Sequence, residues 1–104
     1  MKKLSGTVIH GDSYGKVLGY PTANLNTPLD SIDLEQGVYA AKTMHKGKEY
    51  SSSLIIDRRR NKVEVNLFDF SGDLYDQKLT VQPLKKINDL LSVSSEEALK
   101  HIIQ

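Results

Sequence analysis

The chain has 104 residues, of which 38% are hydrophobic and 26% are charged. This size and composition predict one globular domain over residues 1–104. The formal net charge of +1 argues against a nucleic-acid partner, because nucleic-acid-binding domains carry a markedly basic face. The lack of cysteine excludes disulfides, thiolate catalysis and Cys-based zinc sites. No apolar run approaches the ~18 residues of a membrane helix, and the N-terminus is too polar for a signal peptide, so we expect a cytoplasmic protein with no membrane partner.

The first half of the chain predicts three short strands and a glycine-rich loop. Residues 7–10 are a β-branched run between two glycines, which is typical of a strand. Three glycines and a proline predict a loop over residues 11–21, and we expect residues 22–36 to stay irregular. Residues 37–44 and 50–56 are strand candidates joined by a polar turn.

The second half continues the β pattern and then changes period. Residues 62–70 alternate between polar and apolar, as in a half-buried strand. Residues 77–84 form a further strand, and Pro83 predicts that its end lies near a sheet edge. Short strands at this spacing favour a closed antiparallel sheet or a sandwich. A capping box at residues 94–97 then begins a short amphipathic C-terminal α-helix.

The glycine-rich loop contains Gly11, Gly15 and Lys16, which invite comparison with a phosphate-binding loop. The Walker motif needs four residues between its glycines and then Gly-Lys-Ser/Thr. Here three residues intervene and Val17 follows Lys16, so a Walker-type NTPase is excluded. Glycine backbone N–H groups can still wrap a phosphate. The alternative is an ordinary turn.

Thr22 and Asn24 are candidate ligands for a hard cation. Two residues apart on an extended segment, their side chains point the same way. Hydroxyl and amide oxygens suit Mg²⁺, and an Asn amide also binds phosphate oxygens. The alternative is that both side chains satisfy nearby backbone groups in an irregular loop.

Glu64 is a candidate general base. On a strand it shares a face with Phe68 and Phe70, and a carboxylate desolvated beside aromatic rings can serve as a proton acceptor. The alternative is a carboxylate in water at the rim of a barrel. Asp69 falls on the opposite face because its spacing from Glu64 is odd. The two acids therefore form no dyad, and Asp69 is expected to cap the turn at 71–73.

Arg58, Arg59 and Arg60 form a basic turn between two predicted strands. Charge runs are usually solvated, which predicts an exposed hairpin loop. The alternative is a contact with a nucleotide phosphate.

The order of these segments is more specific than any one of them. It comprises Gly-Thr-Val-Ile-His-Gly at 6–11, Gly-Tyr-Pro-Thr-Ala-Asn-Leu at 19–25, Gly-Val-Tyr-Ala at 37–40 and Glu-x-x-x-x-Asp-Phe-x-x-Asp-Leu-Tyr at 64–75. This arrangement resembles the riboflavin kinase family. The resemblance extends over roughly residues 4–103.

The resemblance implies a mainly β fold, a six-stranded antiparallel Greek-key β-barrel with a C-terminal α-helix packed outside. It also implies an enzyme that transfers the γ-phosphate of ATP to the 5′-hydroxyl of riboflavin, giving FMN, with Mg²⁺ bound beside the nucleotide. The partners are then the small molecules riboflavin and ATP. We favour a monomer.

The resemblance also implies roles for particular residues. Thr22 and Asn24 match the positions that hold Mg²⁺ and the nucleotide phosphates. Glu64 matches the base that accepts the proton of the ribityl hydroxyl. The loop that covers the nucleotide in the family corresponds here to Gly11, Gly15, Lys16 and Gly19.

The chain departs from the family pattern in three places. Lys16 replaces an arginine and lacks its bidentate fork. Residues 52–61 replace an Asn-x-Gly-x-x-Pro-Thr segment that belongs to the family's nucleotide site. Residues 88–93 replace an Arg-x-Glu-x-x-Phe run on the flavin side. Tyr75 and Phe68 are candidates for stacking on the flavin ring, although core packing suits Phe68 better.

Two ligand-binding hypotheses remain open, beside a third possibility, a plain structural barrel or protein-interaction module. The first is a riboflavin kinase with a rebuilt periphery, in which the three arginines at 58–60 supply charge to the nucleotide. The second is a catalytically weak or inactive relative that binds flavin or nucleotide as a sensor or regulator. Intact Thr22, Asn24 and Glu64 favour the kinase.

Overall fold

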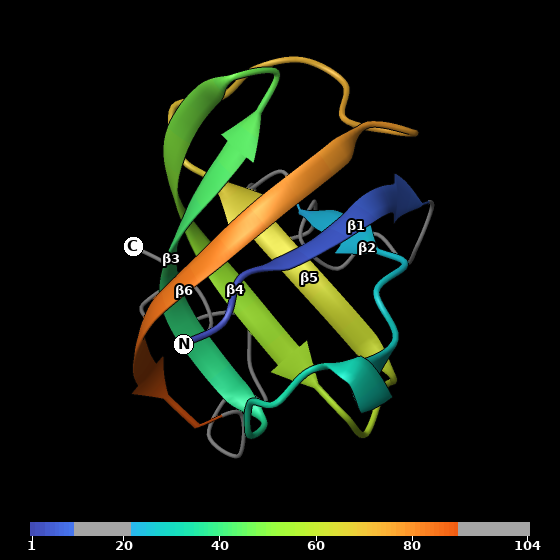
Figure 1. The fold of residues 1–104 in the computed structure, drawn as a ribbon, viewed down its shortest axis with the longest axis vertical. Coiled ribbons are helices and arrows are strands. Elements are labelled where there is room, and N and C mark those ends of the chain that lie inside the picture. Colours follow the sequence, from blue (N-terminus) through green and yellow to red (C-terminus); the bar gives the residue numbers. More distant parts are fainter. Residues whose placement is uncertain (10–21, 90–104) are drawn as a thin grey trace.

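The computed structural model describes residues 1–9 and 22–89, which form a closed antiparallel β-barrel (Figure 1). The barrel order is β1-β2-β5-β4-β3-β6, and β1 pairs with β6 to close it. β6 returns to lie beside β3, the first strand of the β3-β4-β5 meander, which is a Greek-key connection. The expected barrel is confirmed, whereas the expected C-terminal helix lies outside the described residues. The elements are β1 (Leu4–Ile9), β2 (Ala23–Leu25), the 3₁₀ helix η1 (Leu29–Ser31), β3 (Gly37–His45), β4 (Lys48–Asp57), β5 (Lys62–Leu67) and β6 (Lys78–Asn88).

The core consists of the residues that point into the barrel, which are every second residue along a strand. Leu54 and Ile56 of β4 project inward, as do Val63, Val65 and Leu67 of β5. This is the period of two that the sequence shows over residues 62–67. The residues between them therefore face out of the barrel.

β2 corrects the expectation that residues 22–36 are irregular throughout. Ala23–Leu25 pairs with β1 on one side and β5 on the other, and all three residues are buried. Three residues are too few to show a strand period, so the pairing partners rather than local propensity make this strand.

Pro83 lies inside β6 rather than at its end, so the sheet-edge prediction is wrong. Its side chain is fully buried and it pairs with Ala41 of β3. Proline cannot donate a ladder hydrogen bond, and the register shifts between Ala40 and Ala41, directly opposite it. A bulge thus accommodates the proline in a closed sheet that has no edge.

β5 ends at Leu67, earlier than the alternation predicts. Asp69 has a φ of 58°, which breaks the strand geometry. Phe70 then turns to pack against the core, edge-on to His45 at 5.6 Å and to Tyr50 at 5.4 Å between ring centroids. Phe70 therefore does not extend the face of Glu64, contrary to expectation.

Tyr39 on β3 is the largest fully buried side chain, and its hydroxyl donates to the Glu35 carbonyl at 2.7 Å. Burial raises the pKa of the Tyr39 phenol above its usual 10.0. The Asp89 carboxylate, by hydrogen bonding, raises the pKa of Lys86 above its usual 10.5. Both groups hold their protons more tightly when the protein is folded. Their contribution to stability is therefore complete below about pH 10 and is lost as the pH rises through the folded-state pKa values.

We expect Tyr39→Phe to lower the free energy of unfolding by about 1 kcal/mol at neutral pH, through the lost hydrogen bond. Above about pH 10, the free energy of unfolding of the variant should fall less steeply than that of the wild type, because the variant lacks the Tyr39 phenol, whose pKa is raised in the folded protein. Urea unfolding followed by circular dichroism across this pH range measures both effects. Parallel pH profiles for the two proteins would contradict the role of Tyr39.

Candidate active site

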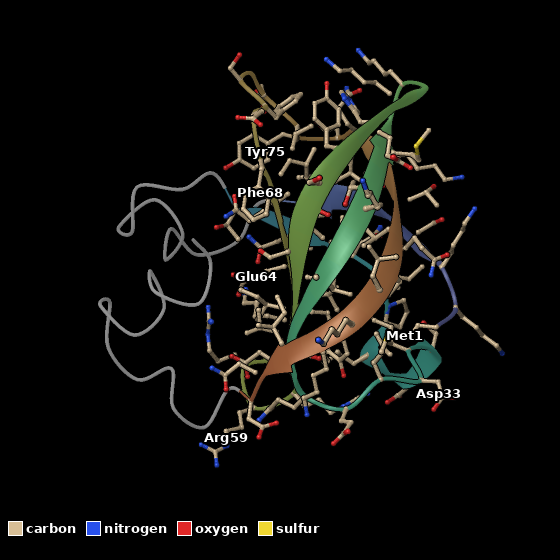
Figure 2. All side chains as sticks on the ribbon, turned by 90° about the vertical axis from the view of Figure 1, so that its left-hand side faces the viewer. Met1, Asp33, Arg59, Glu64, Phe68 and Tyr75 are labelled. Atoms are coloured by element: carbon tan, nitrogen blue, oxygen red, sulfur yellow. The ribbon has the colours of Figure 1, made fainter. Side chains whose placement is uncertain are left out.

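A row of polar side chains lies on the outer face of three neighbouring strands. Glu64 and Asn66 alternate with the inward residues of β5, so they face out of the barrel. The register sets Asn24 of β2 opposite Glu64, and Ser53 of β4 opposite Asn66. Although they face outward, all four are buried, Glu64 to 3% exposure. Figure 2 labels Glu64 on one flank of the barrel, with Phe68 and Tyr75 along the same flank.

Several atoms of this row have no hydrogen-bond partner. They are Asn24 Oδ1, Ser53 Oγ and both amide atoms of Asn66. A buried polar atom left unpaired costs about 1–3 kcal/mol. Nearly all such atoms in folded proteins are paired, so a cluster of them calls for an explanation. One explanation is that these atoms bind a polar ligand, and the same face carries the Glu64 carboxylate.

Arg60 pairs with Glu64, a partner that the sequence did not predict. Its Nη1 atom lies 3.2 Å from Glu64 Oε1 and 3.4 Å from Asp57 Oδ2. The Arg60 backbone N–H also donates to Asp57 Oδ1 at 3.2 Å. The hairpin between β4 and β5 makes this possible, because it pairs Asp57 with Lys62 and returns the chain toward Glu64. The basic turn thus places a positive charge beside the Glu64 carboxylate.

The other two arginines of the basic turn behave differently. The Arg58 guanidinium donates to the carbonyls of Leu34 at 2.7 Å, Ile32 at 3.1 Å and Leu29 at 3.4 Å. Arg59 projects away from the barrel (Figure 2). All three residues are exposed, as expected. The predicted exposed hairpin loop is therefore confirmed, and the charged groups of Arg58 and Arg60 are in addition engaged within the chain.

A pocket of about 240 Å³ is lined by Thr22, by inward residues of β1, β2 and β5, and by the segment that follows β5, whereas none of the four residues of the polar row lines it. Thr22 directly precedes β2 and is two residues from Asn24. In the turn that forms part of the pocket wall, the Asp73 carboxylate accepts a hydrogen bond from the Tyr75 backbone N–H at 2.9 Å. The side chain seen to cap this turn is thus Asp73, whereas Asp69 was expected. Most of the remaining lining is apolar, and the full set is Val8, Thr22, Ala23, Leu67, Phe70, Gly72, Asp73, Leu74 and Tyr75.

The donor set of the row fits Mg²⁺ shared with a substrate. Asn24 Oδ1 is a buried amide oxygen that no hydrogen bond uses, and hard cations take oxygen ligands. Within residues 1–9 and 22–89, no group of three or more His, Cys, Asp or Glu could hold a metal. A site with few protein ligands suits Mg²⁺, which usually keeps waters and shares substrate phosphates.

The structure therefore brings Asn24 and Glu64 together, and Thr22 lines the pocket two residues before Asn24. The predicted loop residues Gly11, Gly15, Lys16 and Gly19 lie outside the described residues. Among the described residues, no helix is long and apolar enough to cross a membrane.

Comparisons with known proteins agree on one family. The family model described as Flavokinase: Riboflavin kinase matches residues 2–104. A Buchnera aphidicola protein named bifunctional riboflavin kinase/FMN adenylyltransferase is 37% identical, over 96% of this chain and 35% of its own length. A Pseudomonas fluorescens protein of the same name is 34% identical, over 97% of this chain and 34% of its own length.

The fold is also found in a solved structure. A crystal structure titled as a macrolide-efflux protein from Streptococcus pneumoniae superposes with a TM-score of 0.79 at 31% identity, over 93% of this chain and 34% of that one. The chain thus spans about a third of the length of these relatives. With a family match over nearly its whole length, the chain belongs to the riboflavin kinase family.

Proposed function

We propose that residues 1–104 form a single riboflavin kinase domain that transfers the γ-phosphate of ATP to the 5′-hydroxyl of riboflavin, giving FMN and ADP. The observation that carries this proposal is the buried Glu64 carboxylate, paired with Arg60 and set opposite Asn24. Family membership favours this activity over the hypothesis of a non-catalytic flavin-binding relative. The adenylyltransferase activity named for the relatives is theirs, and this chain spans only about a third of their length.

Glu64 is the proposed general base. Phosphoryl transfer needs a group that orients the attacking hydroxyl and accepts its proton. Arg60 holds the Glu64 carboxylate in position through its Nη1 atom, at 3.2 Å, and the same Nη1 atom lies 3.4 Å from Asp57. The 5′-hydroxyl proton passes to Glu64 as the hydroxyl oxygen attacks the γ-phosphorus and the bond from that phosphorus to the ADP oxygen breaks.

Thr22 and Asn24 are the proposed ligands on the nucleotide side. Asn24 would hold Mg²⁺ through Oδ1, and Thr22, two residues before it, would bind from the wall of the pocket. When bound, Mg²⁺ neutralises the charge that develops on the phosphates. At about 240 Å³, the pocket is smaller than the ~300–1,000 Å³ of whole-ligand sites. We infer that it takes one planar part of a substrate between apolar walls.

The segment that departs most from the family pattern contributes to this site. Residues 52–61 supply Ser53 to the polar row, and Asp57 and Arg60 to the partners of Glu64. This supports a rebuilt periphery rather than a lost site. We propose a monomer that acts in the cytoplasm on small molecules, without nucleic acid.

Chromatography of reactions that contain riboflavin, ATP and Mg²⁺ tests the proposal. We expect FMN and ADP in equal amounts, and no product when EDTA removes the metal. A sample that forms no FMN, yet is stabilised by riboflavin or ATP in a thermal-shift assay, would contradict the kinase and support a binding relative.

A further inference from the structure

Ser53 and Asn66 face each other on the outer surface of β4 and β5, and nothing in the proposed reaction yet uses them. Each is 2% exposed, and Ser53 Oγ, Asn66 Oδ1 and Asn66 Nδ2 all lack a hydrogen-bond partner. Ser52, the residue before Ser53, differs in this respect. Ser52 is equally buried but lies on the inner face, where its hydroxyl pairs with Thr43 at 2.7 Å. The chain therefore satisfies the inward serine and leaves the outward one open.

The chemistry of these atoms limits what they can bind. The Asn66 amide offers one donor and one acceptor group, and the Ser53 hydroxyl both donates and accepts. A phosphate offers acceptors only and would leave Asn66 Oδ1 unpaired. An aromatic ring face would leave all three atoms unpaired. Hydroxyl groups, which donate and accept at once, complete the set.

The position of the pair relative to Glu64 narrows the ligand further. Asn66 lies two residues beyond Glu64 on the same face, which is about 7 Å along a strand. A five-carbon polyol whose terminal hydroxyl reaches Glu64 carries its other hydroxyls within that distance. The ribityl chain of riboflavin has this form.

We propose that Ser53 and Asn66 form a subsite that binds the internal hydroxyl groups of the ribityl chain and so directs the 5′-hydroxyl onto Glu64. This inference rests on the proposed function, since it takes riboflavin as the acceptor. The subsite explains why polar atoms that weaken the unliganded protein are present on this face: such a trade between stability and function is common at binding sites.

Three single variants test the subsite. Asn66→Leu keeps the shape of the side chain, and Ser53→Ala removes only the hydroxyl. Both should raise the KM for riboflavin about tenfold, a loss typical of one hydrogen bond to a ligand. Both should leave the KM for ATP unchanged and raise the Tm of the unliganded protein. Ser52→Ala, the matched control, should lower the Tm and leave the KM for riboflavin unchanged, because it breaks a bond inside the barrel.

Analogues of riboflavin test the contact directly. 3′-Deoxyriboflavin and 4′-deoxyriboflavin should each be poorer substrates than riboflavin for the wild type. With Asn66→Leu, at least one of them should lose no further efficiency, because the variant has already lost the partner of that hydroxyl. Strictly additive losses for both analogues would overturn the proposal. So would an increased KM for ATP alone, or stabilised variants with unchanged kinetics.

Riboflavin binding without ATP, followed by quenching of flavin fluorescence, separates this inference from the kinase proposal. If the wild type binds riboflavin but makes no FMN, and Ser53→Ala or Asn66→Leu weakens that binding, the subsite is supported and the kinase is refuted. If FMN forms but neither variant alters riboflavin affinity or KM, the kinase is supported and the subsite is refuted. Ser53→Ala, the smaller change, supplies this result should Asn66→Leu fail to fold.

Discussion

Glu64→Gln is expected to lower kcat for FMN formation by about 10²–10⁴-fold, the usual contribution of a general base. The amide has nearly the shape of the carboxylate and still fits a position that is only 3% exposed, but it cannot accept the proton of the attacking hydroxyl. Arg60 keeps Asp57 as a partner in the variant. We therefore expect the affinity for riboflavin to change little.

Single-turnover FMN formation and riboflavin binding, measured on the same preparation, check this result. Glu49→Gln is the matched control, because Glu49 lies exposed on β4 and pairs only at the surface with Lys42, at 3.7 Å. It should leave kcat unchanged. A Glu64→Gln variant that keeps most of its rate would show that another group orients the hydroxyl. One that loses riboflavin binding as well would show that Glu64 serves binding rather than proton transfer.

The sequence predicted which kinds of residue form the site, and the structure shows which of them meet. The motifs identified Asn24 and Glu64 separately, forty positions apart. Only the pairing of β2 with β5 sets them opposite each other. The alternation over residues 62–67 already placed Asn66 on the face of Glu64, so that residue could have been found. Ser53 could not have been found, because the register of β4 against β5 cannot be deduced from the sequence of either strand alone.

The fold shows the same division between local and tertiary signals. The inward residues of β5 follow a period of two that the sequence displays. β2 has three residues and no period, and exists because the barrel needs a strand between β1 and β5. Pro83 indicates an edge by its chemistry, but a register shift in the facing strand lets the closed sheet keep it inside. In both cases contacts with distant residues override the local signal.

Arg58→Ala is expected to lower the free energy of unfolding by about 2 kcal/mol. The Arg58 guanidinium ties the segment around η1 to the β4–β5 hairpin through the carbonyls of Leu34 and Ile32, at 2.7 and 3.1 Å. Hydrogen bonds from a charged group contribute about 1.5–3 kcal/mol when buried, and the exposure of Arg58 reduces this. For a domain of this size, the loss corresponds to a fall in Tm of about 8–16 °C.

Arg59→Ala is the matched control, because Arg59 carries the same charge as its neighbour Arg58 but projects away from the barrel (Figure 2). It should change stability by less than about 0.5 kcal/mol, as surface substitutions usually do. Arg58→Lys should recover only part of the loss, since one ammonium cannot reach several carbonyls as a planar fork does. Equal Tm values for Arg58→Ala and Arg59→Ala would mean that the turn is held by its backbone alone, including the bond from the Arg58 N–H to Gln36 Oε1 at 2.8 Å. The run of three arginines would then be the uniform solvated loop that its composition predicts.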